Sequence, residues 1–165
     1  IGDVLFNIVF TGITNVVCTL VAIYTVERLG RRKLMLIGAL GLAIVYLTLG
    51  TCYFMGIKGS FMVILVMLAI ACYAMTLGPV AWVLIAELFP SRVRAVAVAT
   101  CTFALWIGST TLTYTFPLMN NSLGSYGTFW VYAAICAVSF IYFLRVLPET
   151  KGKSLEEIEK EFTKK

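Results

Sequence analysis

One stretch of the sequence holds residues that could bind a solute and also let a helix bend. It covers residues 77–95 and reads LGPVAWVLIAELFPSRVRA. Pro79 removes a backbone hydrogen bond and its ring clashes with the preceding helical turn, while Gly78 leaves the backbone pliable. The indole of Trp82 offers a flat apolar surface on which a sugar ring or an aromatic ligand can stack. We predict a broken helix with a binding platform at Trp82; the alternative is a packing kink with an interfacial tryptophan.

The depth of Trp82 bears on this choice, because the run is apolar and long enough to cross a bilayer. Trp82 lies eight residues before Pro90, where the run ends, and this spacing corresponds to about 12 Å along a helix. Tryptophans of the membrane-interface belts normally lie closer to the helix end. Breaks within membrane helices are tolerated where the backbone lines a cavity. We therefore expect Gly78, Pro79 and Trp82 to lie beside such a cavity.

Two other apolar segments also carry polar side chains. Asn15 places an amide well inside the first segment; it could bind a sugar hydroxyl or hydrogen-bond to a neighbouring helix, and the sequence leaves both open. In the segment near residue 106, polar residues recur at three- and four-residue spacings, which gives one stripe on a helix. The stripe consists of Thr102, Trp106, Ser109, Thr110 and Thr113. We expect it to face a cavity or another helix and not lipid.

Charged residues gather where the apolar segments end. They are Glu27, Arg31, Glu87, Arg92, Arg94 and Glu149. An unpaired carboxylate at Glu87 would be costly at the edge of a membrane, so we expect a cation partner such as Arg31 or Arg94. An ion pair of this kind can hold one conformation and break in another. For Arg92 we favour ordinary anchoring at the inner membrane surface.

The chain offers little for covalent or metal chemistry. It contains no histidine, and its five cysteines show no CxxC spacing, so zinc and haem sites are poorly supplied. The sequence also has no GxSxG motif and no acidic residue deep within an apolar segment. The cysteines are expected to pack as small apolar side chains. We expect no catalytic residue, no enzyme activity, no metal site and no cofactor in this chain.

The elements that carry these residues are predicted to be membrane-spanning helices. Of the 165 residues, 61% are hydrophobic and 13% are charged, a balance too apolar for a soluble domain. Five segments have the length of about 20 residues that a helix needs to cross a bilayer. They are 4–26, 34–55, 61–86, 95–118 and 128–147. We predict an all-α membrane protein with five transmembrane helices, in which Gly38, Gly41 and Gly50 let neighbouring helices approach closely.

The basic residues predict how the helices cross the membrane. All of them except Lys58 fall in three clusters, which begin at Arg28, Arg92 and Arg145 and lie at alternate helix ends. The positive-inside rule puts these three ends in the cytoplasm and puts the N-terminus and the loops at 56–60 and 119–127 outside. The net charge of +5 thus reports membrane topology, and we expect no nucleic-acid partner. The predicted location is the cell membrane, with several passes.

The C-terminal residues 148–165 differ from the rest of the chain. Pro148 is expected to end the fifth helix, and Ser154 with Glu157 has capping-box spacing at the start of the segment SLEEIEKEF. This spacing predicts a short amphipathic helix that lies in the cytoplasm against the bundle. An odd number of spans and a first residue other than Met lead us to expect a fragment of a longer protein.

Three segments, ERLGRRKL, GPVAWVLIAELFPSRVRA and LPETKGKSLEEIE, resemble the signature segments of the sugar porter family of the major facilitator superfamily. The resemblance covers essentially the whole chain and corresponds to the last five of the family's twelve helices. It implies a partial C-terminal transmembrane bundle at residues 1–147 and a cytoplasmic segment at 148–165. It also implies transport of a monosaccharide, a hexose or pentose, by alternating access. The partners would be the sugar, the lipid bilayer and the missing N-terminal half; the alternative is a sugar sensor of the same fold.

The resemblance also assigns roles to individual residues. It implies sugar binding by Trp82, Asn15, Gly78 and Trp106, and a conformational gate formed by Pro79, Arg31, Glu87, Arg94 and Glu149. Close relatives often carry a Gln or Asn just before the second of these tryptophans, whereas this chain has Leu105. A lost hydrogen bond to a sugar hydroxyl can change selectivity by orders of magnitude. Proton coupling in the family depends on an acidic residue of the first helix, outside this chain.

Overall fold

The computed structural model describes residues 2–57, 59–87, 89 and 93–147 and is helical almost throughout that part of the chain. The helices are α1 (Gly2–Leu29), α2 (Arg31–Phe54), α3 (Ser60–Met75), α4 (Leu77–Glu87) and α5 (Arg94–Val146). No strand occurs among the described residues. The prediction of an all-α membrane protein is therefore confirmed. The predicted tail helix at 148–165 lies outside the described residues.

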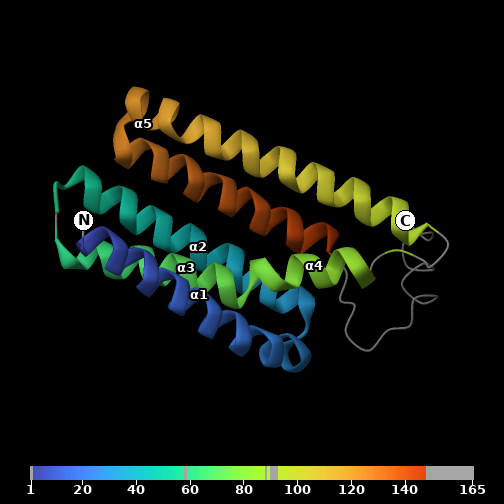
Figure 1. Ribbon diagram of the computed structural model, residues 1–165. Coiled ribbons are helices and arrows are strands. Elements are labelled where there is room, and N and C mark those ends of the chain that lie inside the picture. Colours follow the sequence, from blue (N-terminus) through green and yellow to red (C-terminus); the bar gives the residue numbers. More distant parts are fainter. Residues whose placement is uncertain (1, 58, 88, 90–92, 148–165) are drawn as a thin grey trace.

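The five helices are not the five that the sequence predicted. The third predicted span consists of two helices, α3 and α4, and the last two spans are joined in α5. The 53 residues of α5 would extend about 80 Å as one straight helix, far more than the roughly 30 Å of hydrocarbon. Gly124 has φ 72° and ψ 171° inside α5, and the chain turns back there (Figure 1). We call residues 94–123 the first arm of α5 and residues 125–146 the second arm.

The predicted outer loop at 119–127 is wrong, because the first arm continues as a helix up to Gly124. The loop was predicted because this run, which includes several polar residues, separates two apolar segments, and the chain does reverse within it, at Gly124. In the structure, the Ser122 hydroxyl donates to the Leu118 carbonyl at 2.9 Å, and the Ser125 hydroxyl donates to Asn120 Oδ1 at 2.8 Å. Their polar groups are satisfied locally, so the run does not end the helix. Only glycine readily adopts the left-handed conformation that reverses the chain at residue 124.

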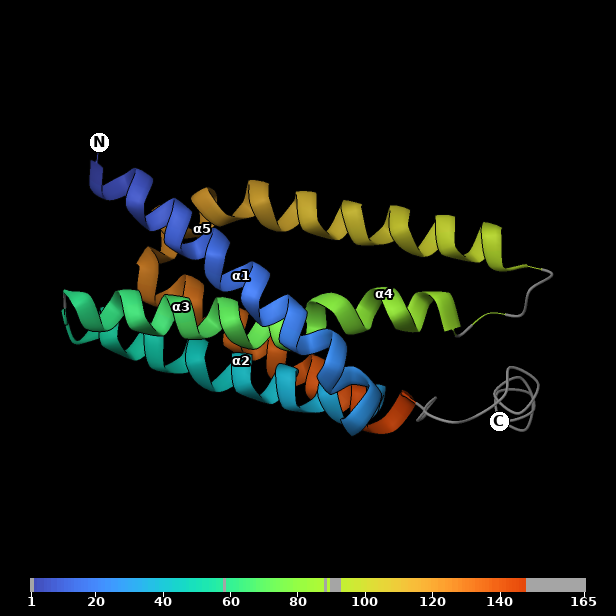
Figure 2. The ribbon, with the colours of Figure 1, turned by 60° about the horizontal axis from the view of Figure 1, so that its bottom comes forward.

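The basic residues that the structure describes lie at one end of the bundle. The turn between α1 and α2 at Gly30, the start of α5 and the end of its second arm lie together at this end (Figure 1). The turn between α2 and α3 and the reversal at Gly124 lie at the opposite end (Figure 2). Arg31, Arg94 and Arg145 therefore lie at the same end of the bundle, as expected for basic clusters at alternate helix ends.

The centre of the bundle is α2, which packs against α3, α4 and the second arm of α5. Two buried clusters lie along α2. One consists of Leu42, Val45, Leu49, Cys52, Met62, Leu65 and Ala69, and the other of Val26, Leu34, Met35, Val80 and Leu84. At Gly50 the second arm comes so close that an added Cβ would lie 2.6 Å from Trp130 Nε1. By contrast, α1 and the first arm expose most of their apolar side chains.

Candidate substrate site and gate

The third predicted span is broken at Thr76. This residue has φ −128° and ψ −86°, between the end of α3 at Met75 and the start of α4 at Leu77. The sequence analysis expected the break at Gly78 and Pro79, which instead lie in the first turn of α4. Backbone N–H groups of a first helical turn have no partner within the helix, so proline fits there without loss. In a continuous helix the Pro79 ring would clash with the carbonyl of Met75, and the chain therefore turns just before α4.

The hydroxyl of Thr76 satisfies a backbone group that the break frees. It donates to the Cys72 carbonyl at 2.5 Å, while the Thr76 N–H donates to the Tyr73 carbonyl at 3.2 Å. The Thr76 carbonyl accepts from the N–H of Val80 at 3.3 Å, which starts the hydrogen bonding of α4. Thr76 is only 8% exposed. Threonine hydroxyls are one of the means by which membrane helices tolerate such breaks.

The two sides of α4 have different surroundings. Val80 and Leu84 are buried and belong to the cluster against α2. Because successive residues are about 100° apart around a helix, Trp82 lies on the opposite side, with Gly78 one turn before it. Trp82 is 48% exposed. The platform predicted at Trp82 is thus on the side of α4 that faces away from the bundle core.

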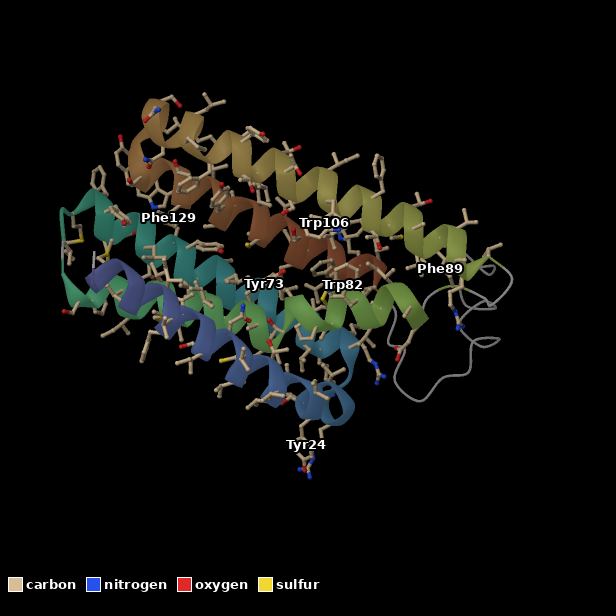
Figure 3. The ribbon with its side chains drawn as sticks, viewed as in Figure 1. Tyr24, Tyr73, Trp82, Phe89, Trp106 and Phe129 are labelled. Carbon is tan, nitrogen blue, oxygen red and sulfur yellow. The ribbon has the colours of Figure 1, made fainter. Side chains whose placement is uncertain are left out.

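Tyr73 joins this side from α3. A Cβ added at Gly78 would lie 3.3 Å from Tyr73 Cε1, so the tyrosine ring lies directly against the glycine. Figure 3 shows Tyr73 and Trp82 on either side of the break. We call Tyr73, Gly78 and Trp82 the aromatic face. The sequence analysis did not identify Tyr73, because the break makes helical spacing useless for relating it to Trp82.

Asn15 lines a cavity of about 440 Å³ together with Tyr73. The other residues around this cavity are Thr11, Tyr46, Leu49, Val66, Ala69, Ile70 and Phe129. The Thr19 hydroxyl lies 2.8 Å from the Asn15 carbonyl and 3.4 Å from Asn15 Oδ1, and its single proton favours the shorter contact. Among the described residues, the Asn15 side-chain amide thus has only this longer contact with Thr19 in α1 and no hydrogen bond to a neighbouring helix. Of the aromatic face, Tyr73 lines this cavity, whereas Gly78 and Trp82, which were expected beside a cavity, do not.

Trp106 stands apart from these residues. It is 60% exposed on the first arm of α5 and lines neither the Asn15 cavity nor the second one. Of the polar stripe predicted around it, Thr113 lines the second cavity, of about 520 Å³, with Tyr46 and Tyr73. Ser109 and Thr110 are exposed. Of these two cavities, the stripe thus meets the second one, at the far end of the stripe.

The charged residues at the basic end include a close ion pair. Arg31 Nη2 lies 2.7 Å from Glu87 Oε1, and the two side chains are 18% and 33% exposed. This pair joins the start of α2 to the end of α4, so Glu87 has one of its two expected partners. Arg94 Nε donates to the Phe89 carbonyl at 3.3 Å, in the connection that follows α4. Glu149 and Arg92 lie outside the described residues.

Residues 2–162 match the family described as sugar (and other) transporter. The chain belongs to the sugar transporter family. It is 36% identical over 150 residues to the arabinose-proton symporter of Bacillus subtilis (strain 168), covering 90% of this chain and 32% of that one. It is 35% identical over 161 residues to the D-xylose-proton symporter of Escherichia coli (strain K12), covering 94% of this chain and 33% of that one.

The fold matches solved structures of the same family. The inward-open conformation of the xylose transporter XylE from E. coli matches with a TM-score of 0.88 and 35% identity, covering 96% of this chain and 36% of that one. The chain thus spans about a third of the length of these relatives. The resemblance to sugar porters of the major facilitator superfamily is confirmed. These relatives carry the names of transporters, which gives no support to the sensor alternative.

Proposed function

We propose that this chain forms part of a transporter that moves a monosaccharide, a hexose or pentose, across the cell membrane by alternating access. The observation that carries the proposal is the break at Thr76. It divides one span into a half that shares a cavity with Asn15 and a half that ends in the Arg31–Glu87 pair. Alternating access requires both a solute site near the middle of the membrane and a gate that opens and closes.

The aromatic face and Asn15 supply the groups that a sugar needs. The exposed indole of Trp82 stacks on the apolar C–H face of the sugar ring, and Gly78 lets the Tyr73 ring lie against the backbone beside it. The Asn15 amide donates to and accepts from ring hydroxyls, and the Tyr73 hydroxyl adds a further polar group at the same cavity. Trp106 lines neither of the two cavities, but its exposed indole on the first arm of α5 offers the sugar a second aromatic contact.

The gate lies at the basic end of the bundle. The Arg31–Glu87 pair holds α4 against α2 in one conformation and breaks in the other. Arg94 fixes the connection after α4 through its bond to Phe89, and Glu149 acts in the same region. Pro79 keeps the break in place, because a continuous helix through it would be strained.

The rest of the transporter supplies what this chain does not. A missing N-terminal half completes the sugar pathway, and lipid covers the outward-facing sides of the helices. The two relatives named as proton symporters favour proton coupling, through an acidic residue outside this chain. The N-terminus of the chain lies outside the cell, and residues 148–165 lie in the cytoplasm, because the basic clusters prefer that side.

The test is uptake of labelled xylose, arabinose and glucose by cells that produce the complete transporter. We expect saturable uptake of at least one of them. Trp82→Ala should reduce this uptake at least about tenfold, because stacking on the indole is lost. Trp82→Phe keeps an aromatic ring and should retain most of the uptake.

The amount of inserted protein is measured for each variant, so that folding and activity are separated. Undiminished uptake by the Trp82→Ala transporter would reject the role of the indole. If the inserted wild-type transporter takes up no monosaccharide, the proposed function is wrong.

A further inference from the structure

A continuous seam joins the first two turns of α2 to the whole of α4. Along α2 it contains Arg31, Leu34, Met35 and Gly38, which share one helix face by their spacing. Along α4 it contains Glu87, Leu84, Val80 and Leu77, in the opposite order. The contacts in the middle of the seam are apolar and buried, with Leu34 1% and Val80 0% exposed. At its two ends the contacts are of a different kind, because each depends on the exact positions of particular atoms.

One end of the seam is the Arg31–Glu87 pair, and the other is a close approach of Gly38 to the break. A Cβ added at Gly38 would meet the Thr76 hydroxyl oxygen, lie 2.7 Å from Thr76 Cβ and lie 3.1 Å from Leu77 Cγ. Non-bonded carbon atoms attract each other only at about 3.5 to 4.0 Å, so the contact to Thr76 Cβ would be a severe overlap. Thr76 Cβ is fixed to the backbone of the break, so no side-chain rotation relieves it. The break could accommodate the added methyl group only by moving.

The neighbouring glycine on α2 provides a contrast. A Cβ added at Gly41 would lie 2.8 Å from Cys72 Sγ, and this sulfur can move by rotation about one bond. Cys72 Sγ also lies 3.9 Å from the Gly38 carbonyl, and the Cys72 carbonyl accepts the Thr76 hydroxyl. Gly38 therefore packs against atoms that are fixed to the backbone of the break, whereas Gly41 packs against the end of the Cys72 side chain.

We propose that Gly38 is a positioning residue for transport, which sets the pivot about which α4 swings when the Arg31–Glu87 pair opens. This inference rests on the proposed function. The 11 residues of α4 make a lever of about 16 Å. A displaced pivot therefore shifts Glu87 relative to Arg31. The apolar contacts between the two ends hold α4 against α2 but do not fix its angle, because they are not directional.

The test uses Gly38→Ala in the complete transporter, with Gly41→Ala as the matched control on the same helix. For each variant, the amount of inserted protein, the equilibrium affinity for sugar and the initial uptake rate at saturating sugar are measured. For Gly38→Ala we expect the rate per inserted molecule to fall at least about tenfold, with affinity within about threefold of wild type. For Gly41→Ala we expect both quantities to stay within about threefold of wild type, because Cys72 can rotate.

A second pair of variants distinguishes the pivot from a general packing effect. Thr76→Gly removes the side chain that the new methyl group would meet. In this background, adding Gly38→Ala should change the uptake rate by less than about twofold, because the two substitutions act on one contact. The comparison also remains informative if Gly38→Ala alone fails to insert.

Three results would overturn the proposal: wild-type rates in Gly38→Ala, an equal loss in Gly41→Ala, or the same loss from Gly38→Ala with and without the Thr76→Gly substitution. Uptake by the wild-type transporter is measured in the same assay. If the wild type transports sugar and any of these results is found, the pivot is wrong while the proposed function stands. If the wild type does not transport sugar, the proposed function itself fails.

Discussion

Leu105 is the residue that we expect to bear most directly on the choice of sugar. It lies on the first arm of α5 beside Trp106, and it is 36% exposed. Its side chain cannot hydrogen-bond, so a sugar hydroxyl that faces it would lose its partners in water without gaining one in the protein. Tyr46 and Tyr73 bring phenol hydroxyls to both described cavities. These two tyrosines thus supply polar groups from α2 and α3.

Leu105→Gln should change which sugar competes best for uptake. Sites built to hydrogen-bond a hydroxyl discriminate strongly against ligands that lack it. We expect the ratio of inhibition by xylose and glucose to change at least about tenfold. Leu105→Met is the matched control, because it is apolar and similar in volume. An unchanged competition profile in the glutamine variant would show that Leu105 does not set selectivity.

The half-helix α4 is the element whose position the proposed gate depends on. It is attached to α3 only through Thr76, it packs on α2 along one face, and its last residue forms the ion pair with Arg31. An ion pair of two partly exposed side chains contributes little to overall stability, about 1 kcal/mol or less when well solvated. That small contribution suits a gate, because a contact that must open in every cycle cannot be strongly stabilising.

Glu87→Gln should slow transport more than it weakens sugar binding. The substitution removes the charge at the gate and leaves the aromatic face and the Asn15 cavity unchanged. We expect the uptake rate at saturating sugar to fall about tenfold, with sugar affinity within about twofold of wild type. Arg145→Gln removes an exposed cation from the same end of the bundle and should leave both unchanged. Equal losses of rate and affinity in Glu87→Gln would argue against the gate.

The whole molecule has far more exposed apolar surface than a water-soluble protein of this size. Side chains along α1 and the first arm of α5, such as Leu20, Ile23, Phe103 and Tyr114, are more than half exposed. Soluble proteins rarely expose apolar patches of this extent. The surface therefore needs a bilayer and further protein to cover it, which agrees with a chain that spans about a third of its relatives.

The proposed orientation predicts which end of the bundle faces the cell exterior. Met55 is exposed at the end opposite the basic residues, and Lys33 is exposed at the basic end. In a transporter whose native cysteines are replaced and which still takes up sugar, Met55→Cys should react with a membrane-impermeant thiol reagent in intact cells. Lys33→Cys should react only after the membrane is permeabilised. The reverse pattern would contradict the orientation.

Local pattern was enough to predict the class of fold, the apolar segments that form the helices and the pairing of Glu87 with a cation. These features follow from apolar length and from the cost of an unpaired charge, which depend on residues close together in the sequence. The loop predicted at 119–127 contains the reversal at Gly124 but was too long, because the preceding polar residue Ser122 bonds within the helix. Local composition does not reveal whether a polar run is satisfied by its own helix.

By itself, the sequence predicted that the third span is kinked or broken near Pro79, since a proline inside a helix crowds the turn before it. It did not decide between the two, because a proline can also lie within a continuous helix, as Pro117 does in the first arm of α5. Only the tertiary structure decided that the turn falls at Thr76, that Tyr73 lies against Gly78, and that Arg31 and not Arg94 lies 2.7 Å from Glu87. The reason is that the position of the turn and the choice of ion-pair partner depend on which residues of α2 lie opposite α4 and the break. Gly38 leaves room for the Thr76 side chain, and Arg31 lies two turns before Gly38 on the same face of α2. The local pattern of the third span contains no information about these residues of α2.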